Sequence, residues 1–444
     1  MKKVYLLAMV AVITTCLLSC NDSGRGNNGG KESSENIDVP LPAPINPVIN
    51  VYIENSGSMD GYVNGNTEFK GAIRDMLVLL RHHFGQNNSI RVHFINSRIR
   101  VVTDTQTDLA NFAANLRPRS TPWVVQGDNQ SSSELNNVFR MILDKTDKET
   151  ISILFSDCIY SISGQDAEGL LSNQKSLTKD AFLSRWRQDS LKLATTIVKM
   201  KSKFTGTYYD KNNKKTELRD VGRPYYICII GNNDVMIDFN AKIPLEEGKI
   251  EGFDNKYIIS TGATENIYYS VLPITEKVGR FKSDRDYSTG DYVRGIKEVN
   301  MRNRGDRLTF AVAVDFRNVA AENDYCMNPD NYTLGDNNFR IKEIKPVGEY
   351  NIHPTDKNII KNANPTHLII LEATGTAISN VKVSLKKQMP QWIAETNIID
   401  DSNIRSNLDK TFGIKYLIEG IAESYQVLYP MDKNFFEFEI KIKE

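Results

Sequence analysis

A short strand that breaks into a serine- and glycine-rich turn, followed by a helix, constrains the fold of this chain more than any other stretch. Residues 48–53 form an apolar, β-branched run that is typical of a buried strand. Beyond the turn, apolar residues recur at spacings of three and four, which predicts a helix with one face toward a core. These residues are Phe69, Ile73, Met76, Leu77 and Leu80. Because open α/β sheets bind ligands at the carboxyl ends of their strands, the stretch predicts an α/β fold with a site at this turn.

The turn at residues 54–59 reads Glu-Asn-Ser-Gly-Ser-Met. One carboxylate and two hydroxyls on a tight turn supply hard oxygen ligands, which suit Mg²⁺ or Mn²⁺. Gly57 allows the backbone to turn tightly between the two serines. The turn resembles the metal-ion-dependent adhesion site of von Willebrand factor A domains, whose pattern Asp-x-Ser-x-Ser has Asp where this chain has Glu54. The resemblance implies a Rossmann-like sheet with helices on both faces, and a metal whose open position takes a carboxylate from a protein partner.

The resemblance also implies a hydroxyl ligand on a loop that precedes a later helix. Apolar residues from Leu135 onward predict that helix, and aligning its stripe with the family puts Ser133 nearest the ligand position. Ser132 and Ser131 lie close behind it in the sequence. A serine that caps the helix is the alternative interpretation of this loop.

The last ligand implied by the resemblance is an aspartate at the end of a strand. Residues 150–156 form an apolar run that ends at Asp157, and Cys158 stands where the family has glycine. An aspartate at the end of a strand is otherwise a common turn residue. The full metal site implied by the resemblance consists of Glu54, Ser56, Ser58, Ser133 and Asp157, with Asp60 as a substitute carboxylate.

The first 46 residues have the pattern of an exported, membrane-anchored chain rather than of a folded domain. Two lysines precede an apolar stretch that is too short to span a bilayer comfortably, so residues 1–19 are predicted to be a signal peptide. Residues 17–20, Leu-Leu-Ser-Cys, resemble the lipobox of bacterial lipoproteins, which implies cleavage before Cys20 and its acylation with chains such as palmitate. An ordinary secretory peptide or an uncleaved anchor is the alternative. Residues 20–46 are rich in Gly, Ser, Asn and Pro, which predicts a flexible tether.

The rest of the chain is predicted to form two domains. Strands and helices alternate over residues 47–240, which predicts a von Willebrand A-like, mostly parallel sheet covered by helices on both faces. Within it, residues 177–204 have a helical pattern and residues 204–220 are predicted to be an exposed hairpin. Residues 241–444 contain alternating strand patterns and one helix at 408–425, which predicts a β-rich, sandwich-like domain.

Composition excludes some classes of function. The chain has 55 Lys and Arg against 55 Asp and Glu in 444 residues, so it lacks the basic excess typical of nucleic-acid binding. The cysteines beyond the signal peptide, Cys20, Cys158, Cys228 and Cys326, show no disulfide framework and no Cys/His metal spacing.

These features predict a lipid-anchored protein of the bacterial cell envelope that binds a protein partner, with Mg²⁺ or Mn²⁺ at the adhesion-type site. The substitution at Glu54 favours the alternative of a metal-free scaffold or assembly subunit. A serine hydrolase with Ser56 or Ser58 as nucleophile is a third hypothesis, but neither serine has a Gly-x-Ser-x-Gly elbow around it. We therefore expect a binding protein rather than an enzyme.

Overall fold

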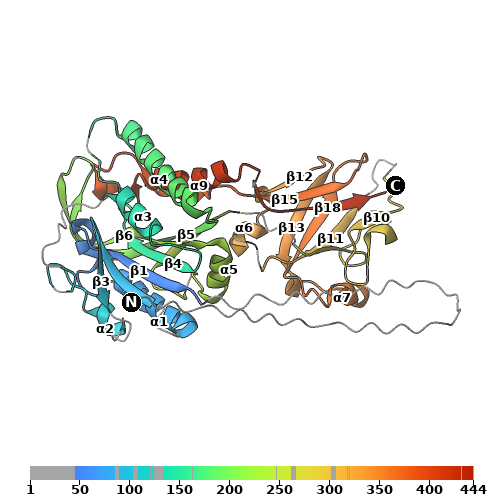
Figure 1. Ribbon diagram of the computed structural model, residues 1–444. Helices are drawn as coiled ribbons and strands as arrows, with labels where there is room; N and C mark the ends of the chain where they lie inside the picture. Colours follow the sequence, from blue (N-terminus) through green and yellow to red (C-terminus); the bar gives the residue numbers. More distant parts are fainter. Residues whose placement is uncertain are drawn as a thin grey trace, which may run out of the picture. The chain divides into compact units, whose positions relative to one another are not determined.

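The computed structural model describes residues 46–85, 90–103, 109–120, 122–124, 134–162, 164–246, 248–261, 267–301, 307–317, 319, 321–431 and 433–443 (Figure 1). The predicted signal peptide, the acylation site at Cys20 and the predicted tether up to residue 45 lie outside these residues. In the part of the chain that is described, no helix has both the length and the apolar character needed to cross a membrane.

The site predicted from the sequence lies on a seven-stranded sheet. Its strands, in spatial order, are β3 (Ile99–Thr103), β2 (Ile90–Ile95), β1 (Val48–Glu54), β4 (Thr150–Ser156), β6 (Lys215–Asn232), β5 (Leu193–Tyr209) and β7 (Phe253–Ser260). β1 pairs in parallel with both β2 and β4, and every other neighbouring pair is antiparallel. The order β3-β2-β1-β4 coincides with the first four positions of the 3-2-1-4-5-6 order of doubly wound folds. Parallel pairing is therefore confined to β2, β1 and β4, and four of the predicted ligands lie on or directly after β1 and β4.

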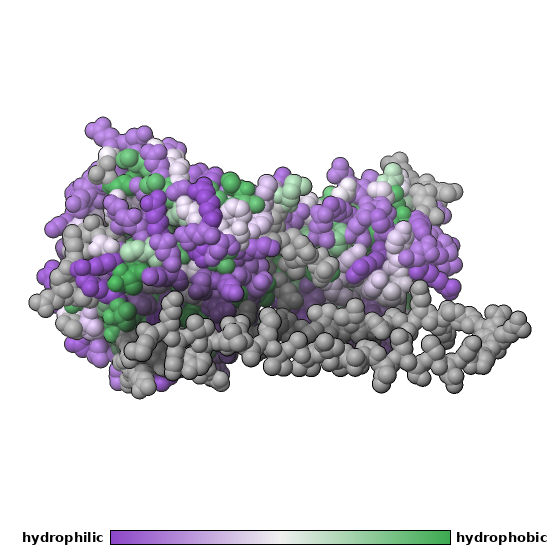
Figure 2. All heavy atoms as spheres, in the orientation of Figure 1, coloured by the Kyte–Doolittle hydropathy of each residue, from purple (hydrophilic) through white to green (hydrophobic). Residues whose placement is uncertain are grey.

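Helices cover both faces of this sheet, as predicted (Figure 1). One face packs against α1 (Glu68–Phe84), α2 (Leu109–Ala114) and α5 (Asn233–Lys242). The other face packs against α3 (Leu135–Leu143), α4 (Ala167–Asp189) and α9 (Ile414–Leu428). The predicted stripe of α1, from Phe69 to Leu80, is fully buried in the first of these cores. On the side shown in Figure 2, the surface is mainly hydrophilic, with hydrophobic residues scattered over it.

The helix predicted at residues 177–204 is wrong over its second half. α4 ends at Asp189, and the chain then enters β5, a strand of 17 residues. Ala194 and Ile197, which fitted a helical stripe, lie in β5 between β6 and β7. Thr195 and Thr196, consecutive residues whose side chains lie on opposite faces of the sheet, are both fully buried, because a central strand is covered on both faces. The predicted hairpin is confirmed, since β5 and β6 pair on either side of a turn at residues 210–214.

The carboxyl half contains two sheets that share one apolar core, as the sandwich-like prediction requires. One sheet is antiparallel and consists of β13 (Phe339–Pro346), β14 (His367–Ala373), β11 (Thr309–Val314) and β8 (Tyr269–Leu272). The other, mostly antiparallel, consists of β12 (Tyr332–Leu334), β15 (Val381–Lys386), β18 (Asn434–Ile442), β10 (Gly295–Lys297) and β9 (Lys282–Ser283). The short helices α6 (Asn323–Met327), α7 (Pro354–Ile360) and α8 (Gln391–Thr396) were not predicted, because they are too short for a periodic pattern.

The domain boundary predicted at residue 240 differs from the structure. β7 belongs to the seven-stranded sheet, where it pairs with β5. The predicted helix at 408–425 is present as α9, but it packs on α4 and the sheet rather than inside the sandwich. A small parallel pair, β16 (Asn397–Ile398) and β17 (Thr411–Phe412), precedes it. Residues 45–444 form one compact unit, so the two architectures are not separated at a single point in the sequence.

Candidate functional site

The candidate site lies where the carboxyl ends of β1, β2 and β4 meet at one edge of the sheet. Parallel pairing brings these three ends together, so the residues that follow each strand become neighbours. β1 contributes Glu54 and the turn after it, β2 is followed by Asn96, and β4 ends at Ser156 and Asp157. Glu54 and Asp157 are 2 % and 4 % exposed, so two carboxylates are buried at this edge.

The strand register explains which side chains meet. Ile53 lies opposite Phe155 in the β1–β4 ladder, so the following residues, Glu54 and Ser156, are neighbours on the same face. The Ser156 hydroxyl donates to Oε2 of Glu54 and accepts a hydrogen bond of 2.9 Å from the backbone N–H of Cys158. Ser56 donates to Oε1 of Glu54 at 2.7 Å. Both carboxylate oxygens of Glu54 therefore accept a serine hydroxyl.

The hydrogen bonds continue through Ser58 to the second carboxylate. The hydroxyls of Ser56 and Ser58 are 3.1 Å apart, and the Ser58 hydroxyl is hydrogen-bonded to Asp157. Asp157 also accepts a bond of 3.2 Å from the backbone N–H of Ile159. Four of the five residues predicted as metal ligands thus form one continuous cluster, which we call the serine–carboxylate cluster: Glu54, Ser56, Ser58 and Asp157, joined by Ser156.

The fifth predicted ligand, Ser133, lies outside the described residues, as do Ser132 and Ser131. The helix that follows them, α3, begins at Leu135, and its N-cap position is Glu134. The Glu134 side chain does not cap the helix; it accepts a hydrogen bond of 2.7 Å from the Asn137 amide. The residue at the N-cap is therefore not a serine, contrary to the alternative interpretation of this loop.

Burial and like charge both act on Asp157. Burial raises its pKa above the ordinary value of 3.8, the nearby Glu54 carboxylate raises it further, and together they bring it to about 7. The hydrogen bonds from Ser58 and Ile159 act in the opposite direction, and the charge of Arg223 does so more weakly. The described groups that favour the charged form of Asp157 therefore offset its burial and the Glu54 charge only in part.

The buried side chain of Arg223 is the cation that acts on Asp157 from β6. It is 1 % exposed, and its Nη1 donates to the backbone oxygens of Leu408 and Lys410, at 3.0 Å in both cases. Its guanidinium also lies over the Tyr208 ring, 4.8 Å from the centroid. These contacts hold Arg223 against the 407–410 loop and a tyrosine ring rather than in an ion pair with Asp157.

The short 3-10 helix η1 (Gly57–Tyr62) holds the serine turn in place. The Tyr62 hydroxyl donates to the Pro224 carbonyl at 2.5 Å, and the Tyr62 ring packs edge-on against Phe204. At Gly61 a Cβ atom would come within 2.3 Å of the Phe204 ring, so only glycine allows η1 to lie this close to β5. Gly57 begins η1, and Ser56 occupies its N-cap.

Asp60 is hydrogen-bonded to Trp123 and not to the serine–carboxylate cluster. Its Oδ1 accepts a hydrogen bond of 2.8 Å from the indole N–H of Trp123, a fully buried ring. Burial raises the pKa of Asp60. Asn55 holds the same segment, because its amide donates to the Trp123 carbonyl at 3.1 Å. Asn96 in turn donates to Asn55 at 2.9 Å, so Asp60 and the two asparagines frame the site.

Cys158, directly after Asp157, has a backbone conformation that suits glycine better than a residue with a side chain. Its φ of 52° lies in the left-handed region, which residues with a side chain seldom adopt. The Cys158 sulfur is buried 3.9 Å from the sulfur of Cys228, and both are free thiols. Both cysteines are fully buried.

The donors of the cluster are of the type that binds a hard divalent cation. Carboxylate and hydroxyl oxygens suit Mg²⁺ and Mn²⁺, and the partly uncompensated charge at Asp157 favours a cation nearby. Among the described residues, no group of three or more His, Cys, Asp or Glu side chains is placed to hold a metal. The cluster has two carboxylates, and its other donors are serine hydroxyls.

Sequence reasoning missed Ser156, Asn55, Asn96 and Trp123 as parts of this site. Ser156 carried a usable signal, because it is a polar residue at the end of an apolar run, directly before the predicted ligand Asp157. Asn96 follows β2 in the same way. Nothing in the sequence indicated Trp123, since its contact with Asp60 joins residues 63 positions apart in the sequence.

Comparisons of the chain with protein-family models, with curated proteins and with solved structures return no match. The fold and the site therefore define the class by themselves: an α/β protein whose buried serine–carboxylate cluster lies at the carboxyl edge of parallel strands.

Proposed function

We propose that this is a lipid-anchored cell-envelope protein that binds a protein partner at the serine–carboxylate cluster through a Mg²⁺ or Mn²⁺ ion. The observation that carries the proposal is the convergence of Glu54, Ser56, Ser58 and Asp157 at one edge of the sheet. Such convergence is what a von Willebrand A-like adhesion site requires. The envelope location rests on the lipobox-like residues 17–20, and the partner would supply a carboxylate to the open position of the metal.

The electrostatics of the cluster support a cation at this place. Burying two carboxylates side by side is unfavourable unless a positive charge or a proton offsets them. Protonation of Asp157 is one solution, and its raised pKa of about 7 reflects it. A divalent ion is the other, and when bound it would supply the positive charge that a partner carboxylate needs.

A metal-free scaffold is the second candidate, and the contacts of Glu54 favour it. Both oxygens of this side chain already accept serine hydroxyls, from Ser56 and Ser156. The extra methylene of glutamate, compared with the aspartate of the family, gives the carboxylate the reach to lie between them. A cluster closed in this way is a stable structural element without any ion, and partner binding would then use another surface.

Metal titration followed by thermal melting separates the two candidates. Protein stripped with EDTA is melted with increasing Mn²⁺ or Mg²⁺, and metal at about 100 times its Kd stabilises by about 2.7 kcal/mol. Ser58→Ala removes a ligand without touching the two hydroxyls on Glu54, so it should lose most of the metal-induced shift in Tm. Ser176→Ala, an exposed serine on α4, is the matched control and should keep the shift.

Glu54→Asp is a second variant to be melted in the same metal titration. The shorter side chain restores the family's pattern, and we expect it to increase the metal-induced shift. Equal stabilisation of the wild type and Ser58→Ala, or no stabilisation of either, would contradict the metal site and leave the scaffold.

Capture of partners from membrane extracts tests the binding function. We expect the wild-type protein to retain a partner in Mg²⁺ and to release it in EDTA, and Ser58→Ala to retain none. Retention that is equal with and without EDTA would favour the scaffold. Hydrolysis of generic ester or phosphate substrates would favour the third hypothesis. However, His93 is bonded to Asn50 and stacked on Tyr52 rather than placed as a base for Ser56 or Ser58.

A further inference from the structure

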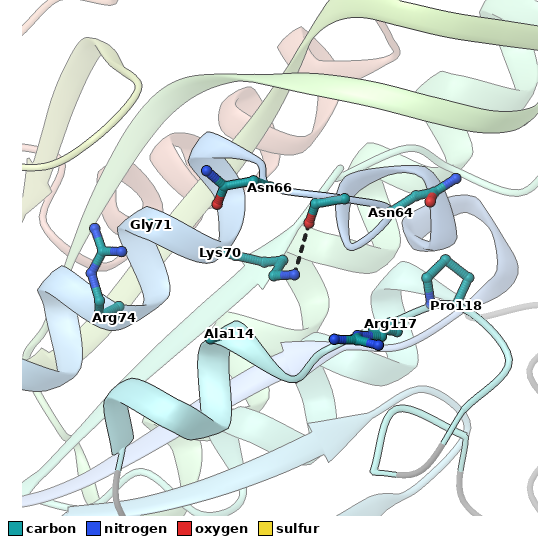
Figure 3. Close-up of a pocket in the computed structure, with 9 residues that line it drawn as sticks. Asn64, Asn66, Lys70, Gly71, Arg74, Ala114, Arg117 and Pro118 are labelled. Carbon is teal, nitrogen blue, oxygen red and sulfur yellow. Dashed lines mark hydrogen bonds between the residues drawn. The ribbon is translucent and has the colours of Figure 1, made fainter.

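A hollow that is separate from the serine–carboxylate cluster opens beside the first turns of α1 (Figure 3). Its volume is about 390 Å³, and it shares no lining residue with the cluster. The loop at 64–66 forms one wall, Lys70, Gly71 and Arg74 of α1 form another, and Ala114, Arg117 and Pro118 at the end of α2 close it. We call this hollow the α1–α2 pocket.

The charges that line the α1–α2 pocket are all positive. Lys70, Arg74 and Arg117 contribute three cations, and none of the described residues that line the pocket is a carboxylate. Lys70 is the strongest indication of a binding site among these three residues. It is only 8 % exposed, whereas lysine is almost never buried unless it is paired. Its ammonium donates to the Gly65 carbonyl at 2.7 Å and points toward the Arg117 guanidinium (Figure 3).

Within the described part of the chain, no carboxylate compensates Lys70 and Arg117. Arg74 has partners, since it forms ion pairs with Asp75 and Glu251. Among the described residues, no carboxylate forms an ion pair with Lys70 or Arg117. Burial, and then the charge of Arg117, lower the pKa of Lys70, which shows that the two cations are close enough to repel. Two positive charges that face each other across a cavity have no structural benefit by themselves.

The start of α1 adds to the positive potential of the pocket. This helix has 17 residues, and the loop at 64–66 directly precedes its N-cap, Thr67, so its positive dipole end lies beside the pocket. Glu68 lies in the first turn but is directed elsewhere, because its carboxylate accepts a hydrogen bond of 2.8 Å from the backbone N–H of Lys203 on β5.

We propose that the α1–α2 pocket binds the phosphate group of a small phosphate monoester. Two uncompensated cations match the charge of about −2 that a phosphate monoester carries above its second pKa, near 6. The planar fork of Arg117 suits the oxygens of a phosphate, and Lys70 supplies a point charge opposite it. A cavity of about 390 Å³ leaves room for the organic part of such a molecule beside its phosphate.

Phenyl phosphate and phenyl sulfate form a matched pair of probes for this pocket. Their shapes are similar, but at pH 7.5 the phosphate carries about twice the charge of the sulfate ester. In metal-free buffer we expect phenyl phosphate to raise the Tm of the wild type and to bind measurably by calorimetry. Phenyl sulfate should bind at least about tenfold more weakly, because one charge of the pocket stays uncompensated.

Variants of the two cations test the assignment of the residues. Arg117→Gln changes an exposed side chain, so the fold should be unaffected while phenyl phosphate binds at least about tenfold more weakly. Lys70→Met keeps the length of the side chain and removes the buried charge. We expect it to abolish the response to phenyl phosphate and, without ligand, to melt at a higher temperature than the wild type.

Lys148→Gln, at an exposed lysine before β4, is the control and should bind like the wild type. Ser58→Ala should also keep phenyl phosphate binding, so failure of the metal site and failure of this pocket are distinguishable. Undiminished binding in Arg117→Gln, or equal binding of phenyl sulfate, would overturn the proposal. A Lys70→Met protein that, without ligand, melts at a lower temperature than the wild type would also overturn the proposal, because Lys70 would then stabilise the fold.

Discussion

At the scale of single residues, Asp157 is held in a setting that penalises its negative charge. Burial and the carboxylate of Glu54 bring its pKa from 3.8 to about 7. Between these two pH values the folded protein binds more protons than the unfolded chain. The contribution of Asp157 to stability therefore falls as pH rises from about 4 to about 7, and it levels off above that pH.

The pH dependence of Asp157→Asn tests this setting. An uncharged amide removes this contribution, so we expect the stability of metal-free Asp157→Asn relative to the wild type to rise between about pH 4 and pH 7, and the variant to be the more stable of the two at pH 8. Denaturant unfolding across this range, in EDTA, gives the measurement. Asp144→Asn, at an exposed carboxylate after α3, should keep the wild-type slope. Equal slopes in the wild type and Asp157→Asn would contradict the prediction.

Single residues were also where the sequence was most informative about the site. Glu54, Ser56, Ser58 and Asp157 were all predicted, because the turn at 54–59 and the strand end at Asp157 resemble the parts of a metal-ion-dependent adhesion site. Ser156 was missed, since its role depends on the register between β1 and β4, which no local pattern contains. Lys70 was missed for a related reason: its side chain is buried only because α2 lies against α1.

At the scale of elements, η1 is fixed by its close approach to β5. Gly61 lies against the Phe204 ring, and a Cβ atom would come within 2.3 Å of it. At Gly206, also on β5, a Cβ atom would come within 2.9 Å of the Gly61 Cα. The position of the serine turn therefore depends on two glycines and an aromatic ring rather than on the turn sequence alone.

Gly61→Ala should push η1 away from β5 and destabilise the protein by about 1–3 kcal/mol, which is typical of overpacking. The free energy of unfolding measures the effect. Adding Phe204→Leu should recover part of the loss, because a smaller side chain makes room for the new methyl group. A Gly61→Ala protein within about 0.5 kcal/mol of the wild type would contradict this packing argument. Gly290→Ala, with open space around its Cβ position, is the matched control.

At the scale of the whole molecule, the seven-stranded sheet depends on a helix from the far end of the sequence. The face of the sheet that carries Tyr52 and Cys228 is covered by α3, α4 and α9. α9 contributes Leu417, Ile418 and Ile421, all fully buried. A segment that ends after β7 would leave this apolar surface exposed to water.

The segment 46–260 contains the complete sheet but lacks α9, so we expect it to unfold without a cooperative transition and to bind a hydrophobic dye such as ANS. The longer segment 46–443 should unfold cooperatively and bind little dye. Urea unfolding followed by near-UV circular dichroism makes the comparison. A shorter segment that unfolds as cooperatively as the longer one would show that α9 is dispensable for the sheet.

The sequence by itself determined the features that depend on neighbouring residues along the chain. The strand-turn-helix at 48–84, the hairpin after β5 and the acidic residues at strand ends follow from periodicity and turn chemistry, which are local. Only the tertiary structure decided the features that depend on distant partners: Ala194 and Ile197 lie in a strand because β6 and β7 pair with it. The same holds for α9 on α4 and for Lys70 facing Arg117, since burial and charge at these positions come from segments far away in the sequence.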